Sequence, residues 1–272
     1  QPDQASWQGV RGHGLIRVCG SAAVSGEPVQ IDVITLFPAM FKGFIEESMM
    51  RRAARLGAAR IELVDLRDFA QDSRRTADDR PYGGGPGMVM KPEPVFEAVE
   101  SLRRPGTRVI LMTPAGRRFD QAQARRLARE RHLILVCGHY EGIDERVRQA
   151  LVTDELSIGD YVLTNGALPA AVVVDAVVRL LPGVLGGGEA ATRDESFTEN
   201  LLEHPQYTRP PVFRGMRVPA VLQGGDHEAV AAWRRERALR ATARRRPDLL
   251  PETDRGPVRP RQRALRGRRS ET

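Results

Sequence analysis

The stretch that decides the fold is LILVCGHYEGIDERVRQAL, residues 133–151. Its first five residues, LILVC (133–137), form an apolar run without a polar break, which is typical of a strand buried on both faces. Residues 142–151 then carry a helical pattern. A buried strand followed at once by a helix is the repeating unit of α/β proteins with a parallel sheet.

The same alternation of strands and helices extends through most of the chain. Besides LILVC, short β-type runs occur at IDVITLF (31–37), RIELVDL (60–66) and RVILM (108–112), with helical patterns at about 38–56, 93–103 and 120–131. This order predicts an α/β domain with a parallel sheet covered by helices on both faces. A later segment, LPAAVVVDAVVRLLPG (168–183), is apolar almost all round and predicts a buried helix.

Composition predicts how the chain is divided. Residues 1–30 lack periodicity and are expected to be a disordered extension, which leaves residues 31–186 for the α/β domain. The glycines Gly186 to Gly188 open a flexible linker over 187–196.

A second, smaller domain is expected after that linker. SFTE (196–199) matches a capping box, with Ser196 as N-cap and Glu199 three residues later, so a helical domain over 197–250 is predicted. The Arg- and Pro-rich residues 251–272 are expected to be a disordered basic tail.

Charge favours a polyanionic partner. The chain has 42 basic and 35 acidic residues, a net charge of +7, and all but two of its basic residues are arginine. The helical pattern at 227–246 carries a dense arginine face, which can neutralise phosphates or can simply be a solvated surface. An arginine bias can also reflect genome composition, so charge alone favours nucleic acid without proving it.

Several other classes of protein are disfavoured. Two cysteines and five scattered histidines make neither a disulfide framework nor a metal site, so we assign no metal ligands. The sequence does not show whether a divalent ion assists the chemistry. No apolar run approaches the roughly 18 residues of a membrane span, and no secretory signal is visible. We therefore expect a soluble, cytoplasmic protein without a membrane partner.

The glycine-rich stretch RPYGGGPGM (80–88) does not match the common phosphate loops. A Walker loop needs a lysine directly after its last glycine, and the first lysine here is Lys91. A dinucleotide fingerprint needs a preceding strand and a third glycine, where Met88 stands. The stretch can be an ordinary connection, or a loop whose missing Cβ atoms let the main chain approach a flat ligand closely.

Seven segments together resemble one family. They are ITLFPAMF (34–41), RTADDRPYGGGPGM (75–88), LVCGHYEGIDERV (135–147), SIGDYVLTNGALPA (157–170), RLLPGVLG (179–186), HPQYTRPPVFRG (204–215) and RPDLL (246–250). In this order they resemble the bacterial tRNA (guanine-N1)-methyltransferases, the TrmD family, over residues 31 to about 250. The resemblance implies a SPOUT-type α/β domain with a deep trefoil knot, which the periodicity would not predict.

The resemblance also implies a reaction. Members transfer a methyl group from S-adenosyl-L-methionine to N1 of the guanosine at tRNA position 37, next to the anticodon. They act as homodimers in which the linker carboxylate and small domain of one subunit complete the cofactor site of the other. Two alternatives stay open: a related knotted RNA methyltransferase acting on another base or a ribose hydroxyl, and a basic RNA-binding protein without catalysis.

Methylation at N1 requires a base, because this nitrogen carries a proton at neutral pH. Arg179 matches the family's catalytic arginine, although Asp175 and Arg179 are also spaced for a simple ion pair on a helix. The family's catalytic aspartate corresponds to Glu195 when the alignment is anchored on the following Ser-Phe, and to Asp194 when it is counted from Arg179. We prefer Glu195 and keep Asp194 open.

The family's cofactor pocket maps onto three stretches of this sequence. By resemblance it comprises Thr113, Pro114, Gly138, Glu141, Ile158, Gly159, Asp160, Tyr161, Val162, Leu163, Gly166 and Pro169. Asp78, Pro86 and Gly87 of the glycine-rich loop are candidates for shaping the place where guanine enters. The sequence departs from the family at NGALP (165–169) and at His139, where arginine is common, and we assign His139 no chemistry.

Overall fold

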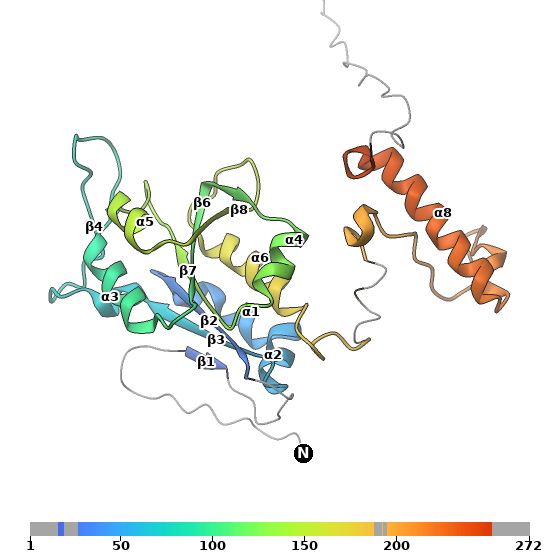
Figure 1. Cartoon of the computed structure of the whole chain (residues 1–272), viewed down its shortest axis with the longest axis horizontal. Helices are drawn as coiled ribbons and strands as arrows, with labels where there is room; N and C mark the ends of the chain where they lie inside the picture. The colour runs from blue at the N-terminus through green and yellow to red at the C-terminus, as the bar shows by residue number, and fades with distance from the viewer. Residues whose placement is uncertain (1–15, 19–26, 188–191, 193–194, 252–272) are drawn as a thin grey trace, which may run out of the picture. The chain divides into compact units, whose positions relative to one another are not determined.

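The computed structural model describes residues 16–18, 27–187, 192 and 195–251, and these divide into two compact units (Figure 1). The first unit ends at Glu189 and the second begins at Ala190. Each unit is described here by itself. Most of the expected extension and linker, and all but the first residue of the expected tail, lie outside the described residues.

The first unit is built on a six-stranded sheet, and five of its strands are parallel (Figure 1). Its strand order is β1-β3-β2-β7-β6-β8. The bounds are β1 Ile16–Val18, β2 Val29–Thr35, β3 Ala59–Asp65, β6 Arg108–Arg118, β7 His132–Cys137 and β8 Asp154–Ser157. Only β1 runs antiparallel, at the edge beside β3. The predicted α/β class with a parallel sheet is therefore confirmed.

Helices cover both faces of this sheet. On one face, the core joins the sheet to α1 (Lys42–Glu46), α2 (Ser48–Arg55), α4 (Gln121–Leu127) and α6 (Ala167–Val178). On the other face, α3 (Pro92–Leu102) and α5 (Glu145–Leu151) pack against it, together with the short helix η2 (Leu66–Phe69). The helix α6 was predicted from its apolar sequence, and six of its residues, spread from its first to its last turn, are buried.

The LILVC run lies in the central strand β7 and is buried on both faces, as expected. Leu133, Leu135 and Cys137 belong to the core under α6, whereas Ile134 and Val136 belong to the core under α3 and α5. Burying one aliphatic side chain of this size stabilises the folded state by about 1.5–3 kcal/mol relative to leaving it exposed to water. Burial also raises the pKa of the Cys137 thiol, so this cysteine is a packing residue and not a nucleophile.

A row of hydrogen-bonded polar side chains crosses the sheet near the start of its strands. His132 is 5 % exposed; its Nε2 lies 2.7 Å from a carboxylate oxygen of Asp32 and its Nδ1 lies 2.7 Å from the Thr107 hydroxyl. The amide of Gln30 donates to the other carboxylate oxygen of Asp32 at 2.6 Å. Because each of these buried polar side chains has a hydrogen-bond partner, its burial costs little of the folding free energy that the surrounding apolar core contributes.

The sequence missed several short strands. Ile16–Val18 pairs with β3, although residues 1–30 were expected to be disordered throughout, and Val29 and Gln30 already belong to β2. Strand β8 lies in a stretch with little β-type character. Two short ribbons, β4 (Asp78–Asp79) with β5 (Val89–Met90) and β9 (Val212–Phe213) with β10 (Met216–Arg217), were also missed.

The second unit is organised around α8, His227–Arg245. Asp226 caps its start by accepting hydrogen bonds from the N–H groups of Glu228 and Ala229, both at 3.0 Å. The buried Thr242 hydroxyl accepts from the N–H of Leu202 at 2.8 Å and thereby ties the incoming chain to the helix. The short helices η3 (Thr198–Asn200), η4 (Ala220–Gln223) and η5 (Pro247–Leu249) complete the unit.

The capping box predicted at Ser196 was wrong. Its hydroxyl accepts a hydrogen bond from the N–H of Glu203 at 3.0 Å, so it closes a turn and does not start a helix. Phe197 and Glu199 have φ angles of +70° and +51°, which a regular first helical turn excludes.

No helix in the described part of the chain is long and apolar enough to cross a membrane.

Candidate active site

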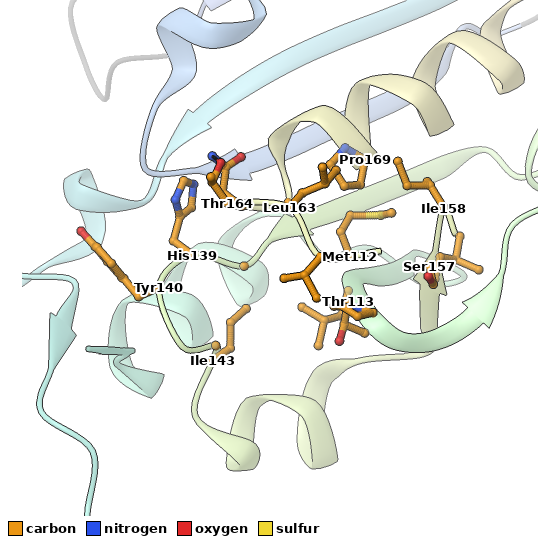
Figure 2. A pocket seen from close by; sticks show the side chains of 18 of the residues that line it. Met112, Thr113, His139, Tyr140, Ile143, Ser157, Ile158, Leu163, Thr164 and Pro169 are labelled. Carbon is orange, nitrogen blue, oxygen red and sulfur yellow. Dashed lines mark hydrogen bonds between the residues drawn. The ribbon is translucent and has the colours of Figure 1, made fainter. Parts of the chain in front are cut away.

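A pocket of about 430 Å³ opens at the ends of β7 and β8, beside the middle of β6 (Figure 2). Its walls are the segments that follow Met112 in β6, Cys137 at the end of β7 and Ser157 at the end of β8. The carboxyl ends of parallel strands are where α/β sheets bind ligands, and the volume suits a small organic molecule. We call it the strand-end pocket.

Two of the three segments are joined through their main chains. The N–H of Gly166 donates to the carbonyl of Gly138 at 2.7 Å, and His139 pairs with Asn165 in an isolated β-bridge. A Cβ at Gly166 would lie 2.8 Å from the Cα of Cys137, closer than real Cβ atoms approach main chain. The crossing of these two segments therefore requires glycine at this position.

The glycine-rich loop lies beside the same pocket. The N–H of Glu141 donates to the carbonyl of Met88 at 3.0 Å, and the N–H of Met90 donates to the carbonyl of Gly142 at 2.9 Å. A Cβ at Gly87, whose φ is +82°, would lie 2.3 Å from Oε1 of Glu141, a residue of the pocket wall. The loop at 80–88 is therefore not a phosphate loop. Its close contact with Glu141 supports the other interpretation, in which its main chain approaches a ligand site.

Tyr140 links the loop and the pocket. Its side chain is hydrogen-bonded to Asp78, and burial together with this carboxylate raises the pKa of its phenol. The residue has a φ of +56°, which is uncommon for a side chain of this size. A strained residue at the rim of a pocket is typical of a functional loop.

The lining combines apolar side chains with carboxylates. Leu156, Ile158 and Leu163 supply apolar surface, and Glu141 and Glu145 supply negative charge. Arg148 contacts Glu145 and lies 3.0 Å from Glu155, and its hydrogen bond holds the pKa of the Glu145 carboxyl below its usual range. Such a lining suits a ligand with a flat apolar part and a positively charged part.

His139 is the unusual polar group of this wall. The residue is 5 % exposed, and its Nε2 is buried without a hydrogen-bond partner among the described residues. Its ring lies 5.1 Å from that of Phe37, and Figure 2 shows it on the side of Thr164. Burial, and secondarily the nearby Arg67 guanidinium, lowers the pKa of His139, so the imidazole is neutral at neutral pH.

Eleven of the twelve residues expected at the cofactor line this pocket; Asp160 is exposed and does not. Of the expected substrate loop, Pro86 is exposed, Asp78 contacts Tyr140 and Gly87 contacts Glu141. Motif matching had left out several lining residues, among them Glu145, Arg148, Ser157 and Asn165. Ser157 ends β8 and Asn165 lies in the loop after it, so a polar residue at or after a strand end was the available signal for these two, whereas Glu145 and Arg148 lie on α5.

Of the expected catalytic residues, Arg179 belongs to the same unit as the pocket but does not line it. Arg179 caps the far end of α6, about 15 Å along the helix axis from Pro169 at the pocket. Glu195 is half-buried in a turn of the second unit, and its carbonyl accepts from the N–H of Thr198 at 3.0 Å. Asp194 lies outside the described residues.

Comparison with known proteins extends over both units. The family model described as "tRNA (Guanine-1)-methyltransferase TrmD" matches residues 29–252. The chain belongs to this family. Similar curated proteins, each named tRNA (guanine-N(1)-)-methyltransferase, come from Geobacillus kaustophilus (57% identical, covering 82% of this chain and 92% of the relative) and Moorella thermoacetica (57%, covering 84% and 93%). A third comes from Dictyoglomus turgidum (53%, covering 83% and 91%).

Membership of the TrmD family explains why the pocket and the glycine-rich loop occur together. The match includes all three pocket segments, the loop at 80–88 and the whole of α8. The reaction of this site is therefore methyl transfer to a guanine of tRNA. The alternative of an RNA-binding protein without catalysis is not favoured.

Proposed function

We propose that this chain transfers a methyl group from S-adenosyl-L-methionine to N1 of guanosine 37 in the anticodon stem-loop of tRNA. Family membership gives the reaction, methylation of guanine N1 in tRNA. The identity of the donor, the position in the tRNA and the assembly of the site are the proposal. The observation that carries it is the strand-end pocket, whose walls are the segments matched by resemblance to a cofactor site.

The lining of the pocket fits this donor. S-adenosyl-L-methionine, when bound, supplies a methyl group on a positively charged sulfur. Leu156, Ile158 and Leu163 offer apolar surface for an adenine ring, and the carboxylates of Glu141 and Glu145 can hold a positively charged group. Gly138 and Gly166 leave main chain at the pocket wall without intervening side chains.

The target nitrogen must lose its proton before it can attack the methyl group. We assign the base to the linker carboxylate, Glu195 or Asp194, and the stabilisation of negative charge growing on guanine O6 to the Arg179 guanidinium. The proton on N1 passes to the carboxylate while the N1–methyl bond forms and the methyl–sulfur bond breaks. Neither group needs to touch the cofactor.

We propose that a second copy of the chain completes the site. The exposed Leu168 and Val172 form a stripe along α6 that continues through Asp175 towards Arg179. Exposed Phe37 and Met40 lie at η1 (Pro38–Phe41), which packs beside α6. Two copies of α6 packed antiparallel about a two-fold axis would bring each Arg179 towards the pocket end of the partner helix.

The remaining assignments follow from the same family resemblance. We propose that the first unit forms a deep trefoil knot. The hydrogen bond between Gly166 and Gly138 supports this, because it brings the segment after β8 against the earlier loop after β7. We propose a knotted domain over 31–186, a linker over 187–196 and an RNA-binding domain over 197–250. The reaction is assigned to the cytoplasm, where tRNA is matured.

One assay tests the proposal directly. Purified protein, labelled S-adenosyl-L-methionine and tRNA transcripts with guanosine or adenosine at position 37 are combined, and label in the RNA is measured. We expect label on the guanosine transcript alone. Equal labelling of both transcripts would contradict the assignment of position 37.

A further inference from the structure

The second unit contains a pocket of its own, which the methyl-transfer chemistry does not use. Its volume is about 920 Å³, and it lies between the segment 204–211, the short helix η4 and the first turns of α8. Val218, Leu222 and Val230 supply its apolar lining. We call it the aromatic pocket.

Three rings meet in this pocket. The Trp233 ring centroid lies 6.2 Å from that of Tyr207 and 6.4 Å from that of His204, and both pairs are tilted and not stacked face to face. Tyr207 is 49% exposed, and its hydroxyl has no hydrogen-bond partner among the described residues. Ring surface therefore remains open for a flat ligand at the mouth of the pocket.

The charge of the aromatic pocket is positive. Arg209 and Arg234 belong to its lining, and neither forms an ion pair with a described residue. None of the described residues that line it is acidic. The Arg237 guanidinium lies 5.5 Å from the Trp233 ring centroid, and its Nε is buried without a hydrogen-bond partner in the described part of the chain.

Within the part of the chain that the structure describes, the pocket combines an open ring, arginines without an ion-pair partner and a lining without carboxylates. These are the features with which proteins bind unstacked nucleobases. The aromatic face stacks on the base, and arginine neutralises the phosphate that comes with it. A hydrophobic peptide would satisfy the rings and leave Arg209 and Arg234 without partners. The helix α8 continues the positive charge, with six arginines and two glutamates.

We propose that the aromatic pocket binds one unpaired nucleobase of the RNA substrate, at a site separate from the nucleotide that is methylated. This inference rests on the proposed function, because it takes the tRNA anticodon loop as the source of the base. Tyr207 and Trp233 stack on the base, and Arg209 and Arg234 bind the flanking phosphates. The second unit would thus recognise loop shape as well as charge.

Tryptophan fluorescence can report on this pocket alone. The chain has two tryptophans, Trp7 and Trp233, so Trp7→Phe leaves Trp233 as the only one. The full-length variant is titrated with anticodon stem-loop RNA, and then with RNAs in which each loop base in turn is replaced by an abasic ribose. We expect quenching by the intact RNA and loss of quenching at one loop position other than 37.

Kinetics supply the second readout. With Tyr207→Leu, we expect the KM for tRNA to rise about tenfold, the loss typical of one stacked base, while kcat at saturating tRNA stays within twofold. Tyr207→Phe keeps the ring and should restore the KM. Phe213→Leu is the matched control, because Phe213 is a 55% exposed ring with Arg214 at 5.3 Å and lies outside the pocket.

Several outcomes would overturn the inference. Quenching that no abasic substitution alters would mean that the RNA contributes only phosphates here. Equal quenching by free nucleoside monophosphates would assign the pocket to a free nucleotide. Quenching that depends on protein concentration without RNA would assign it to a segment of a second copy. If these results occur while guanosine 37 is methylated, the inference fails and the proposed function stands; if no methyl transfer occurs, the proposed function fails.

Discussion

Gly87 of the glycine-rich loop lies directly against Glu141 of the pocket wall. A Cβ placed on Gly87 would come within 2.3 Å of the Glu141 carboxylate, and the φ of Gly87 is +82°. The loop at 80–88 and the loop after β7 are thus fitted to each other, and the fit sets where a pocket carboxylate can lie.

This contact predicts a functional loss at Gly87. Gly87→Ala should lower kcat/KM for methyl transfer at least tenfold, because the new methyl group displaces Glu141. Gly83→Ala is the matched control, since Gly83 has a φ of +85° with no atom within 4 Å of its built Cβ. Both variants carry a similar backbone cost of about 1–2 kcal/mol. Equal loss of activity in both would show that only loop conformation matters.

Gly166 predicts a loss of folding stability. Its Cβ would meet the Cα of Cys137 and the N of Gly138, both at 2.8 Å, and neither atom belongs to a flexible side chain. Gly166→Ala should lower the free energy of unfolding by about 1–3 kcal/mol, the cost of overpacking. Chemical denaturation of this variant and of Gly186→Ala, where the space is open, checks it. Indistinguishable midpoints would refute the close crossing of the two segments.

The two linker carboxylates can be told apart by their amides. Glu195→Gln should lower kcat at least a hundredfold if Glu195 is the base, whereas Asp194→Asn should then cost only a few fold. The reverse pattern would assign the base to Asp194. Turnover is measured with saturating tRNA and methyl donor. If neither amide slows turnover more than a few fold, the base lies elsewhere.

A shared site predicts complementation between two inactive variants. Gly138→Val should fill the strand-end pocket without unfolding the domain, because the atom nearest to its built Cβ is 3.7 Å away. When this variant is mixed and refolded with the inactive linker amide, heterodimers contain one intact site, and activity should return. Each variant refolded alone is the control. No recovery, with heterodimers present on an affinity-tag pull-down, would place pocket and base in one subunit.

His139 predicts a pH dependence of stability. Its pKa is lowered below the usual 6.5 by burial and then by Arg67, so the unfolded chain takes up this proton at a higher pH than the folded one. The free energy of unfolding should therefore fall as pH drops below about 6.5, and less so for His139→Gln. Urea unfolding at pH 7.5 and 5.5 measures the difference. An identical fall in both proteins would contradict the burial of a neutral imidazole.

The sequence predicted the regular part of the fold from local patterns. LILVC and its neighbouring β-type runs named four of the five parallel strands because apolar periodicity reports burial directly. Strand β8, with the sequence DELS, was not among these β-type runs, since its place in the sheet depends on pairing with β6 and not on β propensity. Ser196 matched a capping box, yet its hydroxyl is used by Glu203 seven residues later.

The candidate site was predictable only in part. Resemblance gave Thr113 in β6, Gly138 directly after β7 and Leu163 in the segment after β8, and the sheet brings these three residues together. The exposed Asp160 was included because it lies inside a matched motif. Motifs could not reveal that Nε2 of His139 is buried and has no hydrogen-bond partner among the described residues, because burial arises from the packing of Phe37 and the neighbouring loops. They also could not reveal that Arg179 and the pocket lie at opposite ends of α6.

The most direct test of the account is the chemical identity of the modified nucleoside. A tRNA transcript with guanosine at position 37 is incubated with the protein and S-adenosyl-L-methionine, digested to nucleosides and analysed by chromatography with mass spectrometry. The account predicts N1-methylguanosine as the product, absent when position 37 is adenosine. Guanosine methylated on its ribose, or a methyl group on another base, would contradict it.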